Sequence, residues 1–395
     1  MAVGTPFHTR TAPLCTSLAW KHWSGYFAAC AYDDFSEPEY HAIRNGSGLI
    51  DISPLYKYDI TGTDAVAFVD RLITRNARTC RVGQVLYAPW CDQHGYVIQD
   101  GTFQRLGDEW FRATAADPSI PWFELNALDL DVQMVDVSEH VAALALQGPT
   151  SREILGRLTS DRITSLAYFR VAQGDLAGID AVVSRTGYTG DLGYEIWVDS
   201  RDAERLWDSL VAAGHGLGLQ PAGLNALDLA RIEAGLPLIE VDFNSSEQAL
   251  TDARKSTPYD IGLGWAVHLS KPTFNGKGAL AAWKARGLPS RFVGLEVSWE
   301  PIERLYEAEG LAPELPTVAS RAGVPIYDEG QQVGRATSSC WSKLLKKFIA
   351  LATVDAAYGE VGRTVDLEMT VEYVRRRVPA RVVTLPFFDP ARKRA

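Results

Sequence analysis

This chain of 395 residues lacks the short signatures of the common enzyme classes. It has no GxxxxGK[ST] phosphate-binding loop, no HExxH zinc motif and no GxSxG nucleophile elbow. The five cysteines are an odd number and form no CxxC pair, which argues against a disulfide framework and a thiolate zinc site. The seven histidines are scattered, with no two at i, i+2 or i, i+4 spacing. We therefore expect no metal site.

Long apolar runs are also missing. The longest clean run near the end of the chain, residues 348–354, is far shorter than the roughly 18 to 20 residues of a membrane helix. The first 23 residues hold no apolar stretch long enough for a secretion signal. We therefore expect a soluble cytoplasmic protein without a membrane partner.

Positive charge is in deficit. Lys and Arg number 39 against 49 Asp and Glu, so the net charge is −10. A chain of this charge repels a polyanion on average, and we expect no nucleic-acid partner. Local basic pockets for small anions remain compatible with this balance.

The composition predicts an ordinary globular protein of two to three domains, because 46% of residues are apolar and 22% are charged. Mixed helix and strand patterns run to about residue 286, where Gly287 and Pro289 interrupt them. Short strand-like runs follow, with few helical patterns. The predicted division is 1–286, holding two α+β subdomains, and 287–395, an antiparallel β-barrel.

Two parts of the N-terminal region have clear patterns. Residues 84–90 and 96–106 read as two strands joined by the turn-prone residues 91–95, which predicts a hairpin. The segment DAERLWDSLVAAGHG, residues 202–216, has one apolar face and predicts a helix that stops near Gly214. The stretch through about Trp23 has no clear period, and we assign it no regular element.

The segment from Ser184 to Val198 reads as a strand end, a glycine-dense turn and a second strand. In an alternating strand, Glu195 shares a face with Trp197 and opposes Tyr194. A carboxylate beside an aromatic ring suits a planar heterocycle that has N–H donors. A surface hairpin with a solvated Glu195 is the alternative.

A helix is predicted to start at Leu224 and to stop at Gly235 and Pro237. Arg231 lies four residues after Leu227, on the side that packs, and a cation there needs an anionic partner. The residues alone leave two partners open, Asp228 at i−3 or the carboxylate of a ligand.

Four separated motifs occur in order: RTGYTGDLGYEI, ALDLARIEAGLPL, IGLGWAV and FNGKGAL. Together they resemble the tetrahydrofolate-dependent one-carbon transferases related to the glycine-cleavage T-protein. A looser likeness extends from about Gly48 to the C-terminal region, so it covers most of the chain. The resemblance implies an α+β fold of three subdomains in a cloverleaf around a central folate-binding opening, with tetrahydrofolate as the one-carbon acceptor.

The resemblance also implies site residues. Glu195 is similar to the carboxylate that pairs with the pterin amino edge, and Tyr188 to an aromatic residue of that pocket. Arg231 looks like the arginine of the helix facing the folate, and Tyr87 like the tyrosine of the first-hairpin strand beside it. Trp265 occupies the GLGW turn, where it is expected to pack near the ligand.

Asp100 falls at the second acidic position of the motif that carries the family's catalytic aspartate. The alternative is that Asp100 has no catalytic role and is simply an aspartate of the hairpin that precedes Gly101. The acidic pair of the aminomethyl-transferring type is here Gln99-Asp100, followed by glycine rather than a hydrophobic residue. Departures of this kind resemble the demethylase branch of the family.

The expected function is therefore transfer of a methyl group from a small O-, S- or N-methylated donor to N5 of tetrahydrofolate. One alternative is the glycine-cleavage aminomethyltransferase, which takes an aminomethyl group from a lipoyl carrier protein. A second alternative is a catalytically silent folate-binding protein of the same fold.

Overall fold

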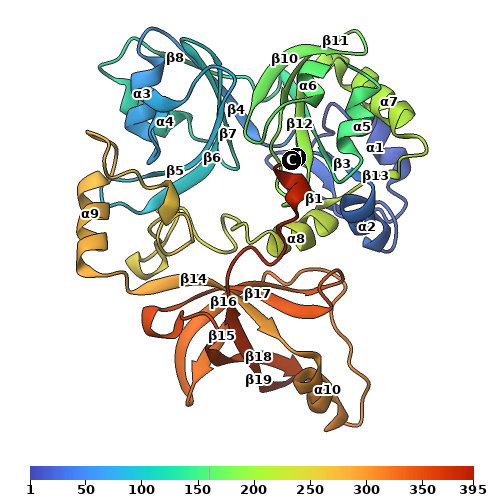
Figure 1. The fold of residues 1–395 in the computed structure, drawn as a ribbon, viewed down its shortest axis with the longest axis vertical. Helices are drawn as coiled ribbons and strands as arrows, with labels where there is room; N and C mark the ends of the chain where they lie inside the picture. Colours follow the sequence, from blue (N-terminus) through green and yellow to red (C-terminus); the bar gives the residue numbers. More distant parts are fainter. Residues whose placement is uncertain (160) are drawn as a thin grey trace.

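The computed structural model describes residues 1–159 and 161–395. Figure 1 shows three β-structures set around the middle of the molecule. We call them the first lobe, built on a six-stranded sheet, the second lobe, built on a five-stranded sheet, and the barrel. Each contains an apolar core of its own.

The first lobe is discontinuous in sequence, because its sheet takes one strand from before the second lobe and the rest from after it. The sheet order is β10-β11-β12-β9-β3-β13. The strands are β3 (Ser47–Asp51), β9 (Val141–Gln147), β10 (Val171–Leu176), β11 (Ile179–Ser184), β12 (Gly193–Asp199) and β13 (Leu219–Pro221). Its helices are α2 (Glu37–Asn45), α5 (Ser151–Gly156), α6 (Asp161–Thr164), α7 (Ala203–Gly214) and α8 (Leu224–Glu233).

Helix α7 forms because its apolar residues recur at helical spacing, and Leu206, Trp207 and Leu210 bury that stripe in the core of the first lobe. From strand β12, Tyr194 and Ile196 enter the same core. Trp197 points to the other face, where it packs with α8 and the barrel.

The second lobe has the sheet order β5-β6-β7-β4-β8. Its strands are β4 (Tyr56–Thr61), β5 (Val85–Cys91), β6 (Val97–Gly107), β7 (Trp110–Ala115) and β8 (Gln133–Asp136), with helices α3 (Ala65–Leu72) and α4 (Ile120–Ala127). Aromatic rings of Trp90, Phe103 and Phe123 meet edge to face in its core. The hairpin β5-β6 that carries Tyr87 and Asp100 is therefore anchored on a rigid support.

The barrel follows helix α9 (Lys277–Arg286) and closes in the order β14-β17-β16-β15-β18-β19. Closure pairs every strand of this antiparallel sheet with two neighbours and leaves no open edge. Its strands are β14 (Ser290–Val297), β15 (Val324–Asp328), β16 (Gln331–Ser342), β17 (Lys347–Asp355), β18 (Thr364–Val371) and β19 (Val374–Val383), and α10 (Trp299–Glu307) lies between β14 and β15.

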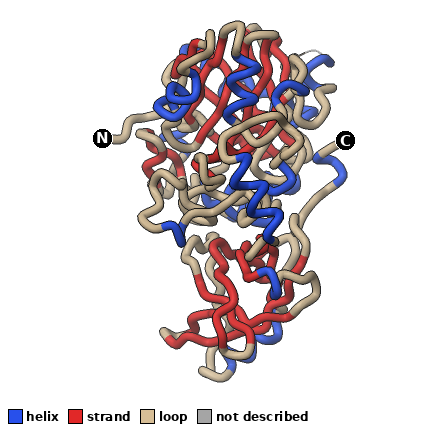
Figure 2. Tube along the Cα trace, turned by 90° about the vertical axis from the view of Figure 1, so that its left-hand side faces the viewer, coloured by secondary structure: helices blue, strands red, loops and turns tan. Residues whose placement is uncertain are grey.

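The chain does not end in the barrel. Residues 384–395, here called the C-terminal tail, run back to the first lobe. Figure 1 shows the red end of the chain there, and Figure 2 shows the C-terminus well away from the strands of the barrel. The Phe388 amide donates to the Glu233 carbonyl at 2.9 Å. Arg392 forms a two-point ion pair with Asp191, with N···O distances of 2.7 and 2.9 Å.

The predicted α+β fold with an antiparallel C-terminal barrel is confirmed, and the division of the chain at residue 287 stays a prediction. The N-terminal stretch, to which we assigned no element, forms α1 (His8–Thr11) and the ribbon β1 (Trp20–Trp23) with β2 (Tyr26–Ala29). These elements are four residues long, too short to show a period. No helix in the described ranges has the length and apolar character needed to cross a membrane.

Candidate functional site

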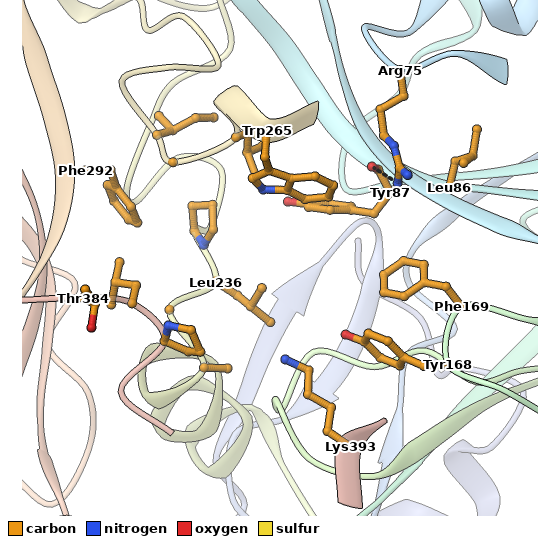
Figure 3. Close-up of a pocket in the computed structure, with 18 of the residues that line it drawn as sticks. Arg75, Leu86, Tyr87, Tyr168, Phe169, Leu236, Trp265, Phe292, Thr384 and Lys393 are labelled. Carbon is orange, nitrogen blue, oxygen red and sulfur yellow. Dashed lines mark hydrogen bonds between the residues drawn. The ribbon is translucent and has the colours of Figure 1, made fainter. Parts of the chain in front are cut away.

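A cavity of about 1000 Å³ lies where the two lobes, the barrel and the tail meet. Figure 3 shows the side chains that project toward it. Residues lining it include Arg75, Tyr87, Phe169, Leu236, Trp265 and Lys393. Its volume is at the upper end of small-molecule sites, which leaves space for a folate and a second substrate together.

Tyr87 and Asp100 form one unit on the β5-β6 hairpin. Tyr87 is in register with Thr102, so Asp100 lies diagonally across on the same face of the ladder. The Tyr87 hydroxyl donates to Asp100 Oδ2 at 2.5 Å. Burial raises the pKa of the Asp100 carboxyl to about 6, against which the bond from Tyr87 lowers it. Asp100 is thus poised to hold or release a proton near neutral pH.

Trp265 lies beside Tyr87 on the cavity wall. Its ring centroid is 6.4 Å from that of Tyr87, with the planes tilted by 36°. Trp265 is 58% exposed, although it belongs to a short 3₁₀ turn in which Ala266 is buried. A large aromatic ring held open in this way offers a face to a planar ligand.

Tyr188 lies in the glycine-dense loop between β11 and β12, and its hydroxyl donates to the Pro237 carbonyl at 2.5 Å. Burial raises the pKa of Tyr188, and both Arg231 and Asp100 are near enough to act on it electrostatically. The loop of the first lobe, helix α8 and the β5-β6 hairpin therefore converge.

Glu195 faces away from the core of the first lobe, as the strand alternation predicts. Thr186 Oγ1 donates to Glu195 Oε2 at 2.7 Å, and Ser184 Oγ lies at 3.5 Å from the same oxygen. Burial raises the pKa of Glu195, and these two bonds lower it. Its side chain is only half-buried, so an oxygen remains free for a ligand.

Trp197, which shares the face of Glu195, is 1% exposed and packs in a core cluster. We expected the Trp197 ring and the Glu195 carboxylate to hold a heterocycle together. For Trp197 this expectation is wrong, because its ring is buried in the core. Sequence alternation places both side chains on one face, but it does not show which part of that face is covered by α8 and the barrel.

Arg231 is fully buried, and its guanidinium is hydrogen-bonded to groups of the protein itself. It donates to Asp228 Oδ1 at 2.7 Å and to Asp242 Oδ2 at 2.6 Å. Further bonds reach the Leu236 carbonyl at 3.3 Å and Ser338 Oγ at 2.7 Å. Of the two partners that the sequence left open, Asp228 is the one observed. Arg231 thus holds the loop that follows α8, whose Leu236 and Pro237 line the cavity.

Glu195, Tyr188, Arg231 and Asp100 do not line the cavity of Figure 3, whereas Tyr87 and Trp265 do. Asp100 reaches it through its bond to Tyr87. The candidate site is therefore a cavity with an aromatic wall. Asp100 is bonded to the wall residue Tyr87, and Glu195 lies outside the described lining.

Sequence reasoning missed several wall residues. Arg75 lies in the segment between α3 and β5, Phe169 precedes β10, and Lys393 belongs to the tail. No local pattern marks them, because they share a wall only after the lobes and the tail have assembled. Within residues 1–159 and 161–395, no group of three His, Cys, Asp or Glu side chains could hold a metal ion.

Comparison with known proteins identifies the family. Residues 8–271 match the GCVT N-terminal domain, and residues 309–389 match the glycine cleavage T-protein C-terminal barrel domain. The chain is 33% identical over 344 residues to an aminomethyltransferase of Desulfitobacterium hafniense, covering 86% of this chain and 87% of that protein. An aminomethyltransferase of Bacillus cytotoxicus is 33% identical over 356 residues, covering 89% of each.

The fold is also that of a solved relative. The crystal structure of the glycine cleavage system aminomethyltransferase T from Bartonella henselae superposes with a TM-score of 0.82 and 23% identity, covering 98% of this chain and 99% of that one. Because the N-terminal domain model alone spans more than half of the chain, and both sequence relatives align over most of it, the chain belongs to the glycine cleavage T-protein family of tetrahydrofolate-dependent one-carbon transferases.

Proposed function

We propose that this chain is an aminomethyltransferase that moves the carbon of a lipoyl-carried aminomethyl group to tetrahydrofolate and releases ammonia. The observation that carries the proposal is the 33% identity, over 86% to 89% of the chain, to proteins named aminomethyltransferase. The Tyr87–Asp100 pair beside the cavity supports it, because the reaction needs a group that handles protons near neutral pH.

In this proposal tetrahydrofolate supplies the N5 nucleophile, and the residues of the chain position it. Glu195 accepts hydrogen bonds from the N–H donors of the pterin edge, since one of its carboxylate oxygens has no protein donor. Tyr188 contributes its ring, and its hydroxyl is bonded to Pro237, which lines the cavity. Trp265 and Tyr87 hold a planar part of the ligand against the wall.

Asp100 acts on protons in this scheme. With a pKa of about 6 it is mostly ionised at pH 7, yet it takes up a proton at little cost. Its short bond from Tyr87 fixes the carboxylate orientation. Correct positioning of reacting groups contributes about 7 to 11 kcal/mol to lowering such barriers.

Two departures that resemble the demethylase branch have structural explanations. Gln99 accepts hydrogen bonds from the amides of Ala116 and Asp117, and its amide group lies 3.3 Å from the Asp117 carbonyl. A carboxylate could not make that last bond. At Gly101, a Cβ would lie 1.9 Å from the Thr114 carbonyl oxygen. Gln99 and Gly101 thus have structural reasons within the second lobe, and neither residue favours one reaction over the other.

The charge of the cavity favours a second candidate, demethylation of an anionic methyl donor. Five cations line the cavity, and no Asp or Glu is among its described lining residues. An aminomethyl group is itself a cation at neutral pH and is repelled by this wall, whereas an anionic donor is attracted. In that reaction N5 attacks the methyl carbon as its bond to the donor breaks. A methoxyarene carboxylate would leave as a phenol that takes up the N5 proton, whereas a betaine would leave as a tertiary amine and a carboxylated sulfonium as a thioether, with the N5 proton released to solvent.

One experiment separates the candidates. The protein is incubated with tetrahydrofolate and either an aminomethylated lipoyl carrier protein or a panel of sulfonium, betaine and methoxyaromatic compounds. Ammonia release with methylene-tetrahydrofolate supports the aminomethyl reaction, and 5-methyl-tetrahydrofolate from one of the panel supports the demethylase. Binding of tetrahydrofolate without either product, unchanged in Asp100→Asn, identifies a silent binding protein.

A second measurement tests the placement of the pterin. Glu195→Gln keeps the shape of the side chain but removes its charge, so about 1.5 to 3 kcal/mol of folate binding free energy is lost. Calorimetric titration should therefore show tetrahydrofolate affinity reduced by about 10-fold to 100-fold. An unchanged dissociation constant would place the pterin elsewhere.

A further inference from the structure

Arg75 is a cation on the cavity wall that has no partner of opposite charge among the residues that the structure describes. It lies beside Tyr87 and Trp265, as Figure 3 shows. Its Nη1 donates to the Tyr87 carbonyl at 3.3 Å, and its Cζ lies 5.3 Å from the centroid of the Trp265 ring. Its Nε is buried and has no acceptor among the described residues. The guanidinium is therefore largely free to bind a ligand.

The fully buried arginines of the described chain have more partners than Arg75, although Arg185 Nε also lacks an acceptor there. Arg44 pairs with Glu233 and Asp191, and Arg231 with two aspartates. Arg185 has no carboxylate partner, but it donates to three backbone carbonyls. Arg75 has one long bond and no ion pair among the residues that the structure describes. A half-buried cation in this condition is stabilised when an anion joins it.

The other charged residues on the cavity wall are also cations. Arg170, Arg291, Lys393 and Arg394 line the cavity with Arg75, and none of the described lining residues is acidic. Lys393 and Arg394 are balanced by Asp389, at 3.4 and 2.9 Å. A protein with a net charge of −10 has thus gathered cations around this cavity. Such a wall attracts anionic ligands and holds them.

The planar fork of a guanidinium matches a carboxylate with two parallel hydrogen bonds. The ring of Trp265 under Arg75 favours a carboxylate joined to a flat group that can rest on the same wall. Arg75 is separated from Asp100 by one residue, Tyr87. The Tyr87 carbonyl accepts a hydrogen bond from Arg75, and the Tyr87 hydroxyl donates one to Asp100.

We propose that Arg75 is a carboxylate-binding residue of the cavity, and that it selects a ligand whose carboxylate lies beside a planar group. The inference rests on the proposed function, because tetrahydrofolate is a ligand of both candidate reactions and the anionic methyl donor is a ligand of the second, and either can supply the carboxylate. One is tetrahydrofolate, through the glutamate attached to its benzoyl ring. The other is an anionic methyl donor.

The test uses Arg75→Gln, with Arg81→Gln as the matched control. Arg81 is exposed and does not line the cavity. Dissociation constants are measured by anaerobic calorimetry for tetrahydrofolate and for the primary amide of tetrahydropteroate, a folate analogue that has no carboxylate. They are also measured for 4-methoxybenzoate and its uncharged amide. Circular dichroism and thermal unfolding check that each variant folds.

If the carboxylate belongs to the folate, Arg75→Gln weakens tetrahydrofolate binding by at least tenfold and leaves binding of the tetrahydropteroate amide unchanged. If it belongs to the donor, both folates bind as before, and the wild-type preference for 4-methoxybenzoate over its amide disappears. Arg81→Gln changes none of these values. Arg75→Lys keeps the charge without the fork, so it retains part of the affinity and serves if Arg75→Gln does not fold.

Unchanged affinity of Arg75→Gln for both tetrahydrofolate and 4-methoxybenzoate would overturn the proposal. The binding measurements do not depend on turnover. Failure of the wild-type protein to form any folate product would therefore count against the proposed function alone, and an Arg75 effect on binding would still stand.

Discussion

At the scale of one residue, burial of the Asp100 carboxyl raises its pKa toward neutrality and lowers the stability of the folded state at high pH. The folded chain raises the pKa of its carboxyl from 3.8 to about 6, chiefly through burial. The folded state therefore binds the proton more tightly than the unfolded state. Its contribution to stability is complete at low pH and is lost as the pH rises through 6.

Asp100→Asn should accordingly raise the free energy of unfolding above pH 6. The gain is about 1 to 2 kcal/mol at pH 8, after allowance for solvent at this half-buried site, and it falls toward zero near pH 4. Folate product formation is lost in the same variant. Urea unfolding at the two pH values measures the effect, and equal destabilisation at both would show that the carboxylate is structural.

The β6 strand shows a constraint at the scale of an element. Gly101 follows Asp100 at a point where a Cβ would lie 1.9 Å from the Thr114 carbonyl oxygen of β7. Both groups are backbone in a paired sheet, so neither can move without parting the strands. Glycine here keeps β6 and β7 close and thereby holds Asp100 against Tyr87.

Gly101→Ala is predicted to destabilise the chain by about 3 kcal/mol or more. The added methyl group would clash with a backbone oxygen, which cannot move aside as a flexible side chain could. Gly107→Ala, on the same strand, is the control, since its nearest contact would be an ordinary 3.5 Å to the Trp110 Cβ. Thermal and urea unfolding of both variants checks the difference. Similar stability of the two would show that the sheet relaxes.

At the scale of the whole molecule, the tail joins parts that are far apart in sequence. The Asp191 side chain is fully buried and contacts Arg392, which is 41% exposed, and Arg44 at 3.5 Å. Arg152 binds the carbonyl of Ala395 at 2.6 Å. These bonds set Lys393 and Arg394 at the cavity.

Arg392→Ala should cost about 1 to 3 kcal/mol, because a buried carboxylate loses its nearer cation. Removal of an exposed barrel pair by Arg363→Ala should cost about 0 to 1 kcal/mol. Hydrogen exchange should also show faster exchange in residues 385–395 of Arg392→Ala alone. Equal effects of the two variants would mean that the tail is held by its other contacts.

Local patterns predicted the elements that carry the site but not all of their surroundings. The hairpin expected at 84–90 and 96–106 is β5 and β6, and the helix expected to stop near Gly214 is α7. In both cases the pattern repeats over several residues within one segment. Trp197 could not be placed in this way, because helix α8 and the barrel decide whether its face is covered.

The sequence by itself determined the family, the α+β class, the barrel and the strand that presents Glu195, since each depends on motifs or periodicity within continuous segments. Tertiary structure alone decided that Arg231 is paired with aspartates, that Arg75 has no such partner in the described part of the chain, and that Lys393 returns to the cavity. Ion pairing and desolvation depend on distances between segments many residues apart, and those distances exist only after the lobes, barrel and tail have packed together.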